Sequence, residues 1–318
     1  MDQKRITPVT TAGCFAGVML ILALLSTYVP FFSIVGYFIM PIPIAIIYMK
    51  FGARWAIMMG AVVGLLMGMF INPAAAVIQL IAFGGVGVAL GAGFRHDWSP
   101  GKLLMGVTLA LAVTFVVAAG AMYVFMDFNV WNFMQDQFKV ITDAVLASYA
   151  DGGMNEIQLA QTKEQLNQIL VLLPSVIPLI FLMGLSMLSY LNIKIAQMVL
   201  TALGYEVRPF LPIRYWEIPR IMLYLYVLAM VCKYWGSTRD IALLNIAGLN
   251  LEALTVFFIS IQGVAFMLFL LGRRFRLSTP MQAVIVGLSM LIPIFQLVAF
   301  IAGMVDMIMG YRKKHSVT

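Results

Sequence analysis

Residues 12–71 read AGCFAGVMLILALLSTYVPFFSIVGYFIMPIPIAIIYMKFGARWAIMMGAVVGLLMGMFI. This stretch contains three apolar runs, which are Ala12–Val29, Ile34–Tyr48 and Trp55–Ile71. A helix needs about 20 apolar residues to cross a bilayer, and a spanning segment must satisfy its own backbone hydrogen bonds. The three runs therefore predict membrane helices. The turn at Pro30 is uncharged, whereas the next one carries Lys50 and Arg54.

The rest of the chain repeats this pattern. Hydrophobic residues make up 63% of the 318 residues, charged residues 10%, and the mean hydropathy is +0.99. Further apolar runs are Ala74–Phe94, Leu103–Met126, Ile169–Leu191, Ile218–Trp235, Glu252–Leu271 and Met281–Met309. The sequence predicts an all-α, polytopic transmembrane helical bundle with about 8–10 membrane segments.

The basic residues predict the orientation, because short cytoplasmic loops hold the excess of Lys and Arg. Lys4 and Arg5 predict a cytoplasmic N-terminus, with the chain in the cytoplasmic membrane. The last run, Met281–Met309, leaves two alternatives. One crossing would put the basic tail outside, whereas a short helical hairpin turning near Pro293 would return it to the cytoplasm. We favour the hairpin.

Residues 127–168 form the one sizeable polar segment, on the predicted outer side. Apolar Met134, Phe138, Ile141 and Val145 recur every three or four residues, and Asp151-Gly152-Gly153 indicates a turn. We predict an amphipathic helical hairpin that lies on the membrane, caps the bundle or pairs with a partner. Its acidic excess favours a cap or a partner.

A proline-rich segment separates two parts of the chain. Three prolines in residues 208–220 forbid a regular helix, while Tyr215 and Trp216 suit the headgroup zone. The predicted organisation is a six-helix module at 1–203, a cytoplasmic elbow at 204–220 and a C-terminal transmembrane extension at 221–318.

Several function classes find no support in the sequence. The net charge of +7 is spread over membrane-flanking loops, which indicates contact with membrane lipid and no nucleic acid. The chain has no GxxxxGK[ST] motif, two distant histidines and two distant cysteines. We expect no metal, no cofactor and no catalytic residues, so the protein is not expected to be an enzyme.

Small residues at helical spacing mark the first run. Ala12 and Ala16, with Gly13 and Gly17 beside them, create a smooth face that lets helix backbones approach closely. Packing within the bundle is the favoured explanation, and docking of another membrane protein is the alternative.

Polar residues inside or at the ends of the runs are costly there and are functional candidates. They are Gln79, Lys233, Glu252, Gln262, Gln296 and Asp306. Lys233 and Glu252 lie near the outer interface, where they can extend towards water. Asp306 is expected to pair with Arg312 and Lys313.

Two sets of motifs resemble known families. AGCFA, VPFF, YFIMPIPIAIIYMKFG and the GAGFRH that ends the fourth run resemble the substrate-binding (S) subunits of energy-coupling-factor vitamin transporters. Over the whole length, RPFLPIRYWEIPR and GMVDMIMGYRKK resemble the YybS-like family of uncharacterised bacterial polytopic membrane proteins.

The resemblance to the S subunits implies specific roles. Ala12 and Ala16 match the small residues that contact the coupling protein there, so the docking candidates are Ala12, Gly13, Ala16 and Gly17. The candidate ligand-binding residues are Tyr37, Asn72, Gln79, Asn129 and Trp131. The acidic hairpin and the extra C-terminal segments depart from the S-subunit pattern and put vitamin uptake in doubt.

The sequence leaves two main functions open. The first is an S-component-like subunit that binds or transports a small-molecule ligand and borrows a coupling transmembrane protein and an ATPase. The alternative is a membrane scaffold protein that holds envelope, division or sporulation proteins.

Overall fold

The computed structural model describes residues 7–71, 73–208, 212–275 and 278–312. Within these ranges the regular structure is helical and contains no strand. Seven described segments are long and apolar enough to cross a membrane: Pro8–Tyr28, Pro30–Phe51, Ala53–Phe70, Pro100–Met126, Leu170–Ala202, Ile221–Thr238 and Ala242–Arg273. The prediction of an all-α polytopic membrane bundle is confirmed.

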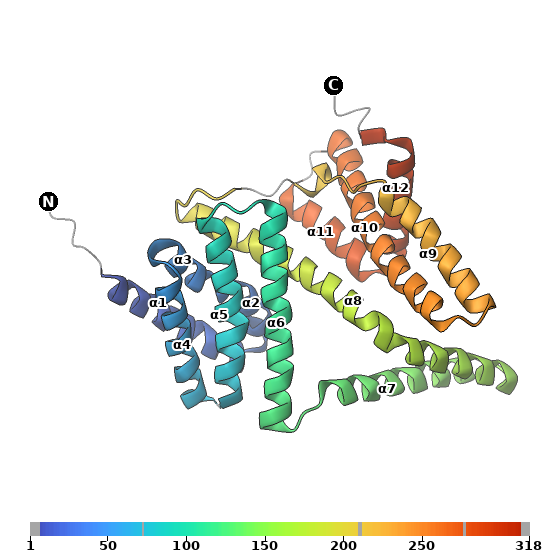
Figure 1. Ribbon diagram of the computed structural model, residues 1–318, viewed down its shortest axis with the longest axis horizontal. Helices are drawn as coiled ribbons and strands as arrows, with labels where there is room; N and C mark the ends of the chain where they lie inside the picture. Colours follow the sequence, from blue (N-terminus) through green and yellow to red (C-terminus); the bar gives the residue numbers. More distant parts are fainter. Residues whose placement is uncertain (1–6, 72, 209–211, 276–277, 313–318) are drawn as a thin grey trace. The chain divides into compact units, whose positions relative to one another are not determined.

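The chain divides into two compact units. Unit 1 contains Met1–Glu164 and Gly184–Phe210, and unit 2 contains Gln165–Met183 and Leu211–Thr318. The helices of unit 1 begin with α1 (Pro8–Tyr28), α2 (Pro30–Ile39), α3 (Pro41–Phe51), α4 (Ala53–Phe70), α5 (Pro73–Arg95) and α6 (Pro100–Met126). The second apolar run is thus two helices, α2 and α3, separated at Met40 (Figure 1).

Proline explains why so many of these helices begin where they do. Pro8, Pro30, Pro41 and Pro100 each stand in the first turn of their helix, where the missing N–H removes a donor that has no intrahelical partner. Met40 between α2 and α3 keeps helical dihedral angles (φ −58°, ψ −35°), so the motif Pro41-Ile42-Pro43 interrupts the helical hydrogen bonds within one apolar segment, Pro30–Phe51.

Around α3 the interior of unit 1 is apolar and closely packed. Residues 41–47 of α3 are all buried, and Met19, Met40 and Met67 belong to the same core. A Cβ atom added to Gly91 of α5 would lie 2.5 Å from the Cβ of Tyr48 and 3.0 Å from the carbonyl oxygen of Ala45. The glycines of α5 thus let its backbone approach α3 closely.

The polar segment begins as the sequence predicts and then differs. α7 (Val130–Asp151) and α8 (Glu156–Ala202) are joined by a turn at Gly152 and Gly153, and Gly153 has φ +84°. α8 is a single helix of 47 residues with Pro174 and Pro178 inside it. The predicted hairpin therefore does not end at residue 168, since its second helix is continuous with the apolar segment that follows.

Unit 2 is built around α10. Its elements are the short 3₁₀ helix η1 (Ile213–Tyr215), α9 (Ile221–Thr238), α10 (Ala242–Arg274), α11 (Thr279–Leu291) and α12 (Pro293–Met309). α10 packs against α9 and α12 (Figure 1). A Cβ on Gly263 would overlap the carbonyl oxygen of Ala299, and one on Gly303 would overlap that of Ile259. The α10 and α12 backbones therefore touch at this crossing.

The last apolar run is broken as the hairpin prediction requires. α11 has 13 residues and α12 has 17, and the extended backbone of Ile292 separates them just before Pro293. A helix of 13 residues is about 20 Å long, which is less than the hydrocarbon thickness of about 30 Å. α11 is therefore too short to cross the membrane as a helix.

Candidate functional site

The most polar part of the interior of unit 2 lies at the C-terminal end of α12. Gly310 caps this helix in the left-handed conformation, with φ 60°, and turns the chain back on itself. Arg312 then donates a hydrogen bond from Nε to Oδ2 of Asp306 over 2.7 Å. Both side chains are almost fully buried, at 6% and 3% exposed. The expected pairing of Asp306 with Arg312 is confirmed, whereas Lys313 lies outside the described residues.

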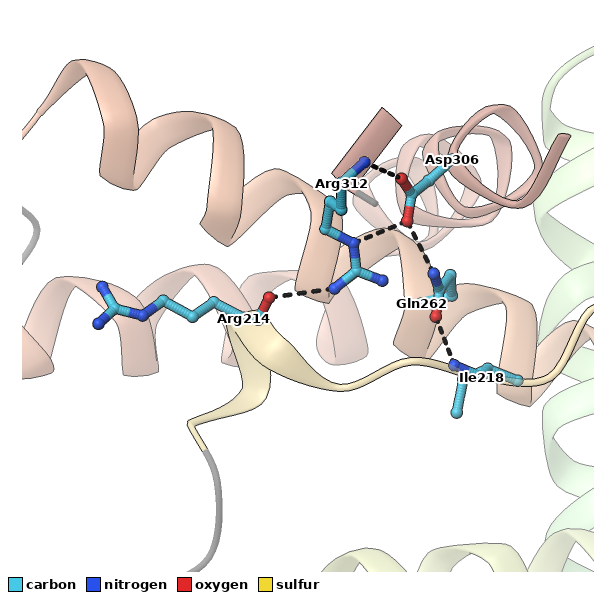
Figure 2. A network of polar contacts seen from close by, with 5 residues as sticks. All are labelled: Arg214, Ile218, Gln262, Asp306 and Arg312. Atoms are coloured by element: carbon cyan, nitrogen blue, oxygen red, sulfur yellow. Dashed lines mark hydrogen bonds and ion pairs between the residues drawn. The ribbon is translucent and has the colours of Figure 1, made fainter. Parts of the chain in front are cut away.

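Hydrogen bonds extend this ion pair to α10 and to the elbow (Figure 2). Gln262 donates from Nε2 to Oδ2 of Asp306 over 2.7 Å and accepts at Oε1 from the backbone N–H of Ile218 over 2.8 Å. Arg312 donates from Nη1 to the backbone carbonyl of Arg214 over 3.0 Å. The end of α12 is therefore fixed beside the elbow.

One donor of the Asp306–Arg312 ion pair has no partner. Nη2 of Arg312 is buried and has no hydrogen-bond partner among the described residues. A buried donor left unsatisfied costs about 1–3 kcal/mol, and more when it is charged. Such a group in a native structure indicates a water, an ion or a ligand that completes it.

A cavity of about 260 Å³ opens at this network. Its lining combines the buried polar groups with the start of α9 and comprises Glu217, Ile218, Pro219, Arg220, Gln262, Asp306, Met307, Gly310 and Arg312. The guanidinium of Arg220 lies over Gly310, because a Cβ added to that glycine would be 2.9 Å from Nη2 of Arg220. Two arginines therefore border one small space, an arrangement suited to an anionic group.

Comparison with known proteins assigns most of the chain to one family. A family model described as "Predicted membrane protein (DUF2232)" matches residues 17–307. The chain belongs to the DUF2232 family. It is also similar to the Bacillus subtilis (strain 168) protein titled "Uncharacterized protein YybS", at 27% identity over 301 residues, which cover 92% of this chain and 94% of that protein. No solved structure matches.

The family assignment confirms the YybS-like resemblance and the membrane class. The part of this DUF2232 chain that the family model matches begins within α1 and ends within α12, and it includes Gln262 and Asp306. The chain is thus an integral membrane protein of the DUF2232 family. The matched region includes residues of both units.

No contact among the described residues brings the five predicted ligand-binding residues together in one site. Tyr37 is half-buried, with its ring 6.0 Å from that of Phe83. Asn129 caps α7 by accepting hydrogen bonds from the backbone N–H groups of Trp131 and Asn132, and Trp131 is exposed. Asn72 and the side chain of Gln79 lie outside the described part of the chain. Ligand binding by these five residues stays a prediction.

The four predicted docking residues separate into two pairs. Ala12 and Ala16 are buried in the core of unit 1, whereas Gly13 and Gly17 are exposed. A Cβ on either glycine would meet nothing within 4 Å. The alanines therefore pack within the chain, and only the glycines present an open small-residue face.

The remaining polar candidates have simpler environments. Lys233 on α9 forms an ion pair with Glu252 on α10, and both side chains are partly exposed. Gln296 on α12 is exposed. Sequence reasoning found Gln262 and Asp306 but missed Arg220 and the elbow carbonyl of Arg214, because no local pattern brings residues 214–220 beside residues 306–312.

Proposed function

We propose that the protein is a membrane-embedded subunit that binds a small molecule and has no ATPase of its own, with the cavity at Arg312 as the ligand site. The observation that carries the proposal is the buried, unpartnered Nη2 of Arg312, a residue whose side chain lines that cavity. Buried ionisable groups in membrane segments are rare, and they often mark a ligand or ion site. The hydrogen bonds from Nε to Asp306 and from Nη1 to the carbonyl of Arg214 hold this arginine in one position.

The orientation supports a ligand that enters from the cytoplasm. The elbow carries Arg208, Arg214 and Arg220, and the positive-inside rule places such a loop on the cytoplasmic side of a bacterial cytoplasmic membrane. Because α12 ends beside the elbow, we expect both termini to be cytoplasmic. A reporter that is active only outside the cytoplasm should stay inactive when fused after Thr318; activity there would contradict this orientation.

Transport would require partners. The sequence lacks a P-loop, so any energy from ATP would come from a separate ATPase acting through a coupling membrane protein. The open face of Gly13 and Gly17 on α1 is suited to such a partner helix.

The test is purification in a mild detergent, followed by mass spectrometry of all associated proteins and small molecules. The wild type should carry a stoichiometric small molecule, and Arg220→Gln should lose it. Arg239→Gln is the matched control, since Arg220 and Arg239 are exposed residues at the two ends of α9. Absence of any small molecule from the folded wild type would contradict the proposal.

A scaffold for envelope, division or sporulation proteins is the second candidate. α7 has no buried residue, although Phe133, Val140, Ile141 and other apolar side chains lie along it. A long helix with exposed apolar residues favours contact with another surface. Recovery of envelope or division proteins without a small molecule, and their loss after Val140→Asp with Ile141→Asp, would support the scaffold.

A further inference from the structure

The free donor of Arg312 has a defined chemistry. Its guanidinium carries donors at Nε, Nη1 and Nη2; Nε is bonded to Asp306 and Nη1 to the carbonyl of Arg214. Nη2 has no partner among the described residues and belongs to a side chain that lines the cavity. We infer that the cavity binds a phosphate group, with its oxygens on Nη2 of Arg312 and on the guanidinium of Arg220; this inference rests on the proposed function.

Two arginines and two carboxylates line the cavity, and its arginine side favours an anion. The charge of Asp306 is already balanced by Arg312 and shared with Gln262, so that carboxylate has its own hydrogen bonds. Arg220 is exposed, and no ion pair that includes it appears within the described ranges. Glu217 also lines the cavity, and its carboxylate would repel an anion placed beside it. The phosphate is therefore expected on the arginine side.

Two guanidinium groups that reach one cavity from different parts of the chain suit a phosphate. Arg312 follows the Gly310 cap of α12, and Arg220 is the N-cap residue of α9. A phosphate has enough oxygens to accept hydrogen bonds from two such groups at once. Arg312 is held rigidly by Asp306 and the elbow, which lowers the ordering cost of binding.

The size and place of the cavity limit the source of the phosphate. A volume of about 260 Å³ suits a headgroup or a small ester better than a large cofactor, since ligand pockets usually measure about 300–1,000 Å³. The neighbouring Tyr215 and Trp216 are typical of the membrane interface, where lipid phosphates lie. The phosphate therefore comes from a lipid headgroup or from a soluble ester.

Two arms of one experiment separate these sources. In the first arm, the delipidated full-length protein in neutral detergent is titrated with inorganic phosphate, with sodium chloride at equal ionic strength as the control for screening. In the second arm, the protein is reconstituted in phosphatidylcholine nanodiscs containing phosphatidylglycerol, and bound lipid is counted by native mass spectrometry. The readout of the first arm is the phosphate-dependent shift of the thermal unfolding temperature.

Arg220→Gln should weaken binding about tenfold or more in the arm that gives a signal, because it removes a charge-assisted hydrogen bond. Arg239→Gln should bind as the wild type does. Arg312→Lys keeps a cation beside Asp306 but lacks Nη2, and it should also lose binding. If Arg312→Lys does not fold, the exposed Arg220 still tests the inference.

The outcomes distinguish this inference from the proposed function. A signal with inorganic phosphate identifies a soluble source, and retained phosphatidylglycerol without such a signal identifies a lipid source; both support the inference. No arginine-dependent signal in either arm overturns it. If a molecule without phosphate co-purifies and is lost in Arg220→Gln, the binding function stands and the phosphate inference fails, whereas no ligand of any kind rejects both.

Discussion

The two units differ in whether they bury charged residues. Unit 1 buries apolar side chains around α3, with α5 brought close by glycine, and it also buries uncharged polar residues such as Ser189 and Asn192. Unit 2 also uses a glycine crossing, between α10 and α12, but at the end of that crossing it buries the charged pair Asp306 and Arg312. Packing alone explains an interior that buries no charge among its described residues. A buried ion pair beside a cavity requires a further reason, and ligand binding supplies one.

The largest expected effect on stability comes from removing one charge of the buried ion pair in unit 2. Asp306→Leu leaves the buried guanidinium of Arg312 without its counterion, and we expect a loss of about 3–5 kcal/mol in the free energy of unfolding. The double variant Asp306→Leu with Arg312→Met removes both charges and should cost much less than the sum of the single changes. Denaturant unfolding in detergent measures the free energy of unfolding of both single variants and of the double variant. If the losses of the two single variants add up to that of the double variant, the two residues are not energetically coupled.

Close helix contact in unit 1 predicts the next effect. Gly91→Ala places a Cβ against Tyr48 and the Ala45 carbonyl, and we expect a cost of about 1–3 kcal/mol from overpacking. Gly17→Ala, in which the new methyl group meets open space, is the matched control on α1 and should cost nothing measurable. Equal unfolding midpoints for both variants would show that α5 does not depend on its contact with α3.

The face of α1 gives a prediction about partners. Ala12→Leu with Ala16→Leu inserts side chains into the core and should lower the yield of folded protein, because both alanines are only 8% exposed. Gly13→Leu with Gly17→Leu should leave the fold intact and reduce the recovery of a coupling protein in co-purification. If the glycine variant retains every partner, this face has no docking role.

The smallest effect is expected at the partly exposed pair. Lys233 and Glu252 have side-chain exposures of 34% and 26%, so Lys233→Met should change the free energy of unfolding by about 1 kcal/mol or less. A double-mutant cycle with Glu252→Gln measures the coupling energy. A coupling energy as large as that of Asp306 and Arg312 would remove the distinction between a buried and a surface pair.

The sequence predicts the membrane fold well because its signal is local. Each run from Ala12 onwards is long, apolar and bounded by turn or basic residues, and the helix break before Pro293 follows from one proline. The pairing of Asp306 with Arg312 is also predictable, since the two residues are only six positions apart and Gly310 lies between them. These features depend on residues close together in the chain.

The rest of the site depends on distant residues. The elbow donates an N–H to Gln262 across 44 positions, and Arg312 reaches the carbonyl of Arg214 across 98. No local periodicity indicates such contacts. The residues proposed from the S-subunit resemblance, such as Tyr37 and Trp131, lie in unit 1 instead. The continuity of α8 was not predicted for a different reason: the change from a polar to an apolar segment after residue 168 does not interrupt the helix.

The most direct test of the ligand site is a cryo-electron microscopy map of the wild-type protein, purified in mild detergent and bound to a rigid antibody fragment. The account predicts non-protein density within hydrogen-bonding distance of Nη2 of Arg312 and in contact with Arg220. An Arg312 side chain turned away from Asp306, or a well-resolved cavity with nothing against Nη2, would contradict it.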